Sequence, residues 1–264
     1  MHMQRRSVLL MATMIMISAT TLATTSNAIS NSTAPSPVVK ANAAESSTFP
    51  QCTPVNVSNF PQSTRITNQY SPMVPGTTYV FAGTADGHPT ANIVQITHKT
   101  KTILNVKTVV VNDTVTVDGK LTESTIDWFA QDKYGNVWYF GEFTTEYKDG
   151  VVLGHEGSFE AGVNGAQPGI IMEGNPHVGD SYCQENAPGV AQDQAKVLSL
   201  HKSVCVPGVC TNGNVLLTEE TSPLAPGSVE NKYYVPGVGA AKAVDVKGGQ
   251  DEVQLVAVLH EDDE

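Results

Sequence analysis

Two carboxylates and an imidazole, Asp127, Glu142 and His155, are the side chains of this sequence whose types and spacing could do chemistry. They lie in the stretch 127–172, whose composition predicts three consecutive antiparallel strands with recognisable turns. Such a set could transfer protons if its acids had separated pKa values, or it could hold a divalent cation. The spacing matches no defined catalytic or metal-binding motif, so it names no reaction.

The first turn of this stretch decides whether the two acids meet. If residues 133–136 form a four-residue loop, Asp132 faces Val137 and each step back along one strand matches a step forward along the other. Asp127 then lies directly opposite Glu142. Like charges placed opposite one another on a sheet are destabilising, so this pair requires solvent, a raised pKa or a cation.

The second turn extends the same face. With Asp149-Gly150 as a two-residue turn, Thr144 faces His155, which becomes a diagonal neighbour of Glu142. Strand alternation then assigns aromatic side chains to the acidic face and others to a core face. The acidic face is predicted to carry Asp127, Phe129, Gln131, Trp138, Phe140, Glu142 and His155, and the core face Ile126, Trp128, Ala130, Val137, Tyr139 and Phe143.

Three interpretations of this acidic and aromatic face stay open. It is a solvated face, a concavity in which aromatic rings bind a ligand that the acids orient, or a site of acid/base or divalent-cation chemistry. The sequence has no Gly-x-Ser-x-Gly elbow and no phosphate-binding loop with a Lys-Ser/Thr ending. It therefore favours a non-enzymatic binding protein and indicates no cofactor beyond that cation.

The N-terminus predicts export. Arg5 and Arg6 precede an uncharged apolar run and then small residues, as in a secretory signal peptide. We expect a signal peptide over 1–28, with cleavage as late as 43. Residues 29–58 are rich in Ser, Thr, Ala, Pro and Asn and predict a disordered tether, and 59–264 predict a single β-rich domain. No membrane anchor is expected after cleavage.

The charge of the chain excludes some partners. The formal net charge is −11, and cleavage after Ala28 removes two arginines and takes it to −13. A protein with no cluster of Lys and Arg is poorly suited to nucleic acid or anionic lipid. We therefore expect no nucleic-acid partner, and a small-molecule or apolar ligand if there is one.

Four cysteines in an exported chain predict disulfide bonds. Pro207-Gly208 predicts a type II turn that brings Cys205 and Cys210 face to face, which leaves Cys52 to pair with Cys183. The paired CxxC spacing of a structural zinc site is absent from the sequence.

Turn chemistry predicts the fold class. Pro-Gly recurs six times between runs rich in Val, Ile, Thr and Tyr, and Asp118-Gly119, Asp149-Gly150 and Gly248-Gly249 are strong hairpin signals. Short connections make the strands antiparallel. We predict an all-β meander that forms a barrel, half-barrel or sandwich, with at most one short helix, at 190–200.

A resemblance adds to this picture. The runs TNQYSPMVPGTTYVF, DWFAQDKYGNVWYFGE, GSFEAGVNGAQPGIIM, HVGDSYCQENAPGVAQD and ENKYYVPGVGAAK resemble a group of exported bacterial β-rich proteins with no established activity. The KYYVPGVG turn is also similar to one in periplasmic half-barrel carriers of lipids or lipoproteins. That resemblance implies a concave face for an apolar ligand. The glutamates within the matching runs are further candidate ligand-binding residues: Glu142, Glu160, Glu185 and Glu230.

Overall fold

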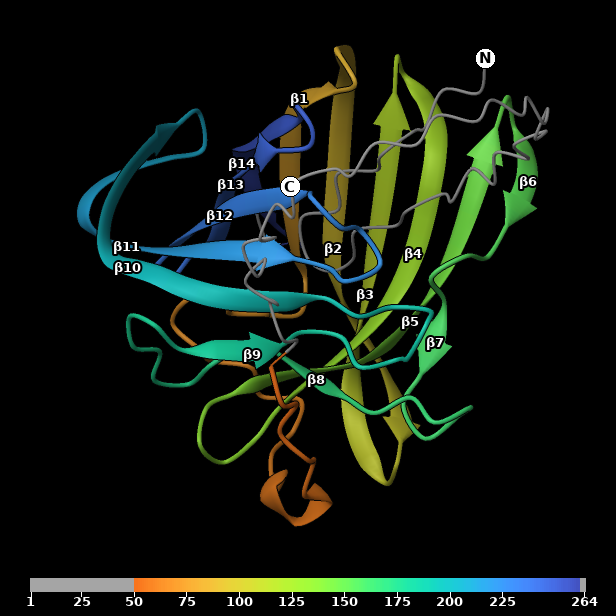
Figure 1. Ribbon diagram of the computed structural model, residues 1–264, viewed down its shortest axis with the longest axis vertical. Coiled ribbons are helices and arrows are strands. Elements are labelled where there is room, and N and C mark those ends of the chain that lie inside the picture. The colour runs from red at the N-terminus through yellow and green to blue at the C-terminus, as the bar shows by residue number, and fades with distance from the viewer. Residues whose placement is uncertain (1–49, 262–264) are drawn as a thin grey trace, which may run out of the picture.

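The protein is an all-β structure, which confirms the predicted fold class. The computed structural model describes residues 50–261, which form one antiparallel sheet of 14 strands and a short 3-10 turn, η1 (Val57–Asn59) (Figure 1). The predicted signal peptide and most of the predicted tether lie outside the described residues. Between residues 50 and 261, no helix has the length and hydropathy of a membrane span. The strands are β1 (Thr77–Ala85), β2 (His88–Ile103), β3 (Val106–Val117), β4 (Lys120–Gln131), β5 (Val137–Lys148), β6 (Val151–Gly154), β7 (Phe159–Glu160), β8 (Gly169–Met172), β9 (Ser181–Cys183), β10 (Gln194–Val206), β11 (Val209–Thr221), β12 (Val229–Val235), β13 (Gly239–Lys247) and β14 (Glu252–His260).

The sheet is open, with β6 at one end and β9 at the other. Its order is β6-β5-β4-β3-β2-β1-β14-β13-β12-β11-β10-β9, and β7 and β8 also pair with β5. The first and last strands therefore lie side by side in the middle of the sheet. Figure 1 shows β10 and β11 running across the direction of β2 to β5, so the sheet is strongly curved.

Tight turns explain why the first half of the sheet is a meander. Asp-Gly pairs at 86–87, 118–119 and 149–150 connect successive strands, and both residues of each pair have positive φ. This is the conformation that a type I′ turn requires, and Asp and Gly tolerate it better than other residues. The predicted hairpins at 118–119 and 149–150 are confirmed, with Val117 opposite Lys120 and Lys148 opposite Val151.

The predicted helix at 190–200 is wrong. Most of this segment belongs to β10, which pairs with β9 on one side and β11 on the other. Ala195 and Val197 are buried in the alternating pattern of a strand. Apolar residues at these spacings fit a helix as well as a strand. Hydrogen bonding to β9 and β11 on the two sides stabilises the segment as a strand.

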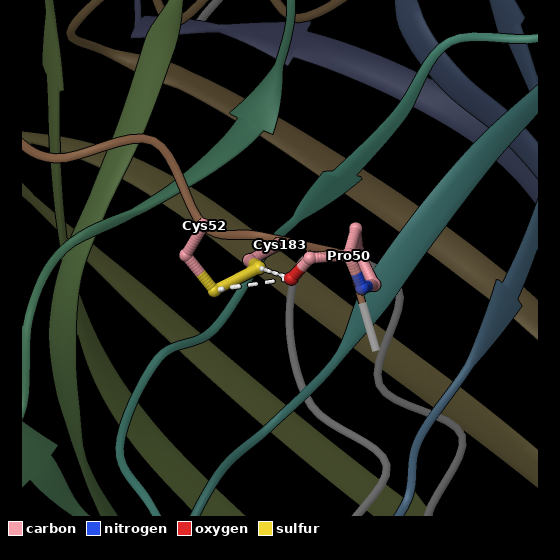
Figure 2. Close-up of a disulfide and its surroundings, with 3 residues drawn as sticks. All are labelled: Pro50, Cys52 and Cys183. Carbon is pink, nitrogen blue, oxygen red and sulfur yellow. Dashed lines mark hydrogen bonds between the residues drawn. A yellow bond between two sulfur atoms is a disulfide. The ribbon is translucent and has the colours of Figure 1, made fainter. Parts of the chain in front are cut away.

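Both predicted disulfide bonds are confirmed. Cys205–Cys210 closes the β10–β11 hairpin, where the two residues are cross-strand partners. Cys52–Cys183 ties the segment before the sheet to β9, and the carbonyl oxygen of Pro50 lies 3.2 Å from Cys183 Sγ (Figure 2). The end of the predicted tether is thus held covalently against β9, at the edge of the sheet.

The buried apolar side chains form two clusters. The larger includes Phe81, Leu216 and Leu255 from the middle and far strands of the sheet. The smaller includes Trp138 and Phe140, and the ring of Phe60 packs on both edge to face. These clusters fix β4 and β5, the two strands that carry the acids.

Candidate functional site

A β-bulge between β4 and β5 positions the two predicted acids. Asp127 is the cross-strand partner of Glu142, as predicted, and Phe129 is the partner of Tyr139. Between these pairs, Trp128 alone lies opposite two residues of β5. The second of the two, Gly141, has φ of +126°, which glycine tolerates at little cost. The extra residue places Tyr139 and Glu142 on one face of β5 although they are three positions apart.

One phenol lies between the two acids. The Tyr139 hydroxyl donates to Asp127 Oδ1 across 2.6 Å and lies 3.1 Å from Glu142 Oε2. The three residues are at most 1% exposed. A hydroxyl carries a single proton, so it can serve only one of the two carboxyl groups at a time. If one of the two carboxyl groups is protonated, it can donate its own proton to the Tyr139 oxygen, and both contacts are then hydrogen bonds.

Burial makes Asp127 a weak acid. It raises the pKa of Asp127 to about 7, with the hydrogen bond from Tyr139 opposing the shift and the charge of Glu123 adding to it. Burial also raises the pKa of Tyr139 well above its ordinary value, helped by the charges of Asp127, Glu142 and Glu185. The set therefore holds protons that exposed carboxylates would lose.

Two further acids on β3 and β4 and one that follows β9 join these residues. We call the six the buried acid set: Asp113, Glu123, Asp127, Tyr139, Glu142 and Glu185. Burial raises the pKa of Asp113 well above its ordinary value, and the charges of Asp127 and Glu123 add to the shift. Asn92 Nδ2 donates to Asp113 Oδ1, whereas Asp113 Oδ2 and Asp127 Oδ2 are buried without a hydrogen bond. An acceptor buried without a donor is costly, so a proton or a cation would stabilise these groups.

Glu230 belongs to a different buried cluster, on β11 and β12. Lys232 Nζ lies 2.8 Å from Glu220 Oε2 and 3.5 Å from Glu230 Oε1. Burial raises the pKa of Glu230 to about 7 although Lys232 opposes the shift. Tyr234 donates a further hydrogen bond to Glu220 Oε1. This cluster carries its own compensating cation, so it differs from the buried acid set.

A pocket lies beside the buried acid set. Its volume is about 250 Å³, and its wall includes Glu142 and Phe159. One side comes from β4, β5 and β7, and the other from residues 187–190, which follow β9 at the opposite end of the sheet. We call it the seam pocket. The side chains used below are Trp128, Phe143, Phe159, Glu160, Val163 and Val190.

Glu160 is the accessible acid of the seam pocket. Its side chain is 37% exposed, and its Oε2 accepts from Lys101 Nζ at 2.7 Å. The same Nζ lies 3.4 Å from the centroid of the Trp128 ring. An indole face and a carboxylate thus bind one ammonium group from two sides.

The structure separates Trp138 and Phe140 from the acids. Tyr139 faces the acids, and its neighbours along the strand therefore point to the other face. Trp138 Nε1 donates to Asp132 Oδ2, and Phe140 packs in the smaller cluster. The predicted aromatic set of the acidic face is therefore wrong for these two residues. Phe129 lies on the predicted face, where its ring stacks on Tyr139 at 4.7 Å.

His155 does not join Asp127 and Glu142 either. Its ring stacks on Phe143, whose side chain is half-exposed, at a centroid distance of 4.7 Å. Its Nδ1 lies 2.8 Å from the carbonyl oxygen of Thr144. The proposed grouping fails because β6 ends at Gly154 and the register shifts within the β5–β6 hairpin. Among the described residues, no three His, Cys, Asp or Glu side chains are grouped so that they could hold a metal ion.

Several residues of the site were missed at the level of sequence. Asp113 occupies the same parity as Val109, Val111 and Val115 on β3, all of which are buried. A charged residue at an inward position of a strand is a signal that strand alternation can reveal. Lys101 offered no such signal, because its role depends on contacts across the sheet.

The covalent structure fits an exported protein. Disulfide bonds persist in oxidising compartments and are rare in the cytosol. All four cysteines of the chain are in disulfide bonds. The protein is therefore secreted or periplasmic.

Comparisons with known proteins extend to the fold only. No family model matches the chain, and no curated protein matches it. It is similar to the structure of a "putative exported protein with YMCC-like fold" from Bacteroides fragilis, with 14% identity and a TM-score of 0.41. It is also similar to that of a "putative lipoprotein" from Parabacteroides distasonis, with 11% identity and a TM-score of 0.40. Each comparison covers 72% of this chain and 98% of the other. These descriptions agree in kind with the resemblance to exported bacterial proteins, and TM-scores this low carry no functional argument.

Proposed function

We propose that this protein is an exported, non-enzymatic binding protein that holds a small, partly apolar ligand in the seam pocket. The observation that supports the proposal is the composition of the pocket wall, which combines three aromatic rings with the accessible carboxylate of Glu160. Binding sites are concave and mostly apolar, with few polar groups that orient the ligand. The buried acid set lies behind one wall.

The volume limits the ligand to a small molecule. The seam pocket measures about 250 Å³, below the usual range of roughly 300–1,000 Å³ for drug-sized ligands. Near Tyr79, Phe81 and Tyr234, a cavity of the sheet interior measures only about 20 Å³, which is room for about one water molecule. The interior cavity is too small for a lipid chain. The seam pocket has room for a ligand with one ring and a short polar arm.

The alternative function, a carboxylate-dependent enzyme or metal-site protein using Asp127, Glu142 and His155, has less support. It needs the imidazole beside both acids, and His155 packs instead on Phe143. The two acids have Tyr139 between them, which suits shared protons more than a reacting substrate.

A thermal-shift screen tests the proposed function. Small aromatic amines, alcohols and acids are added to wild type and to Val190→Phe, whose larger side chain takes up part of the pocket volume. A ligand at 100 times its Kd stabilises a protein by about 2.7 kcal/mol, so hits should raise the Tm of wild type. They should not raise the Tm of Val190→Phe.

Val178→Phe is the matched control. Val178 is an exposed valine that does not line the pocket, so this variant should respond as wild type does. Hits that stabilise Val190→Phe as strongly as wild type would place binding elsewhere and contradict the proposal.

A further inference from the structure

We propose that the ligand of the seam pocket is an organic ammonium ion with a compact apolar body, and that Lys101 occupies its place in the structure described above. This inference rests on the proposed function and names the chemical class of its ligand. It depends on three features: the contacts of Lys101, the carboxylate of Glu160 in the pocket wall and the apolar side chains around it.

The contacts of Lys101 show how two residues of the pocket wall bind an ammonium group. Lys101 Nζ lies 2.7 Å from Glu160 Oε2 and 3.4 Å from the centroid of Trp128. Both Trp128 and Glu160 line the seam pocket. A carboxylate and an aromatic face are the two groups that recognise ligand ammonium ions. A ligand amine in the pocket would find the same two partners.

The side chain of Lys101 can leave this position at low cost. It is 35% exposed, and Glu160 is 37% exposed, so the ion pair is partly solvated. Ion pairs of this exposure contribute little to stability. Lys101 is therefore a weak internal competitor that a ligand can displace into solvent.

The carboxylate in the pocket wall favours a cation. Glu160 lies in this wall and is 37% exposed, so a ligand can reach its negative charge. The acids behind the wall add less charge, because burial raises the pKa of Asp127 to about 7 and that of Asp113 well above its ordinary value. Glu160 would repel an anionic ligand.

The rest of the wall selects an apolar body. The rings of Phe143 and Phe159 and the side chains of Val163 and Val190 provide apolar surface around the carboxylate. Phe159 is itself held edge to face by Tyr139 at 5.6 Å. An amine with one aromatic ring and a two-carbon arm can reach Glu160 while its ring stays among these side chains.

The test uses three probes of one shape and different charge: phenethylammonium, 2-phenylethanol and 3-phenylpropionate. Isothermal titration calorimetry on the full chain at neutral pH and low salt gives the affinities. We expect phenethylammonium to bind about tenfold more tightly than the alcohol, and the carboxylate to bind more weakly than either.

Lys101→Met and Glu160→Gln are the decisive variants. Removing the internal ammonium should raise the affinity for phenethylammonium severalfold and leave that for 2-phenylethanol unchanged. Glu160→Gln should bring the two affinities together. Lys120 and Asp149 form an exposed ion pair of 2.9 Å outside the pocket, so Lys120→Met and Asp149→Asn are matched controls that should change neither affinity.

Two outcomes overturn the inference and differ in what they leave standing. If the ammonium and the alcohol bind equally, Lys101→Met has no effect and Val190→Phe abolishes both, the pocket binds ligands but does not select ammonium. If none of the probes binds wild type or Lys101→Met, the proposed function fails with the inference.

Discussion

Tyr139 donates a hydrogen bond of 2.6 Å to Asp127 although the two residues are not cross-strand partners. Tyr139 pairs with Phe129, and the bulge at Trp128 shortens the path from the phenol to the acid. Both residues are at most 1% exposed. The protonation of Asp127 therefore depends on its hydrogen bond from Tyr139, and the bulge between β4 and β5 brings these two residues together.

Asp127→Asn should change how stability depends on pH. The pKa of Asp127 is about 7 in the folded protein and 3.8 for an ordinary Asp side chain, so the folded state binds this proton more tightly. That contribution is complete below about pH 4 and is lost as the pH rises to about 7. Across this window the free energy of unfolding of wild type should fall relative to the variant, by on the order of 1–4 kcal/mol. Urea unfolding at several pH values measures it.

Glu252→Gln should change the pH dependence of the free energy of unfolding in the opposite direction. Hydrogen bonds from Lys242 and Gln254 lower the pKa of Glu252, so its contribution is present above its unfolded pKa and lost as the pH falls. If the unfolding free energies of wild type and Asp127→Asn ran parallel over the whole range, Asp127 would not be a weak acid in the folded protein.

Lys232→Met should destabilise the protein strongly. Lys232, Glu220 and Glu230 are each at most 7% exposed, and the substitution leaves two buried carboxylates without their cation. Breaking a buried ion pair from one side costs roughly 3–5 kcal/mol. Lys120→Met, which breaks an exposed pair, should cost less than about 1 kcal/mol. Urea denaturation at neutral pH compares the two.

The triple variant Lys232→Met/Glu220→Gln/Glu230→Gln separates charge from packing. It should recover much of the lost stability, because no buried charge is left uncompensated. A triple variant as unstable as Lys232→Met would show that the lysine acts through its packing.

The two disulfide bonds should contribute unequally. Cys52–Cys183 spans 131 residues and Cys205–Cys210 spans 5. Loop entropy predicts about 5 kcal/mol for the longer loop and about 2 kcal/mol for the shorter. Cys52→Ser/Cys183→Ser should therefore lower the Tm more than Cys205→Ser/Cys210→Ser does, as measured by calorimetry. The reverse order would indicate that the β10–β11 hairpin depends on its crosslink.

Gly141→Ala should disrupt the bulge. Gly141 has φ of +126°, and an added Cβ would lie 2.2 Å from the carbonyl oxygen of Phe159. Strained backbone and a clash with main chain together should cost at least about 2–3 kcal/mol. Gly119→Ala is the control, since Gly119 also has positive φ but has open space around it, and it should cost about 1 kcal/mol. Thermal unfolding measures both, and equal losses would mean that the contact with Phe159 is not limiting.

The predicted pairing of Asp127 with Glu142 is right, but the four-residue loop at 133–136 from which it follows is not. The loop is one residue longer than assumed, because Asp132 caps it by accepting from the amides of Tyr134 and Asn136. Gln131 therefore takes the place opposite Val137 that Asp132 was given. The bulge adds one residue to β5 and restores the predicted register beyond it.

Between the loop and the bulge, the faces of β5 are inverted relative to the prediction. This is why Trp138 and Phe140 lie away from the acids while Tyr139 lies among them. A one-residue slip moves every side chain to the other face, and local turn chemistry does not reveal a bulge. The hairpins and the Cys205–Cys210 bond could be predicted because each depends on a few adjacent residues, and Cys52–Cys183 was then the pairing left. The seam pocket could not, since its two sides come from opposite ends of the sheet.

The Cys52–Cys183 bond also determines how the protein would carry mechanical tension. A pull between residues before Cys52 and the end of β14 passes through the sulfur bridge directly to β9. The backbone between the two cysteines, which contains β1 to β8, cannot be extended by this pull, and it bears load only through contacts such as the pairing of β1 with β14. The half of the sheet that carries the buried acid set would keep its shape under traction, and only the strands from β10 onward could be drawn out.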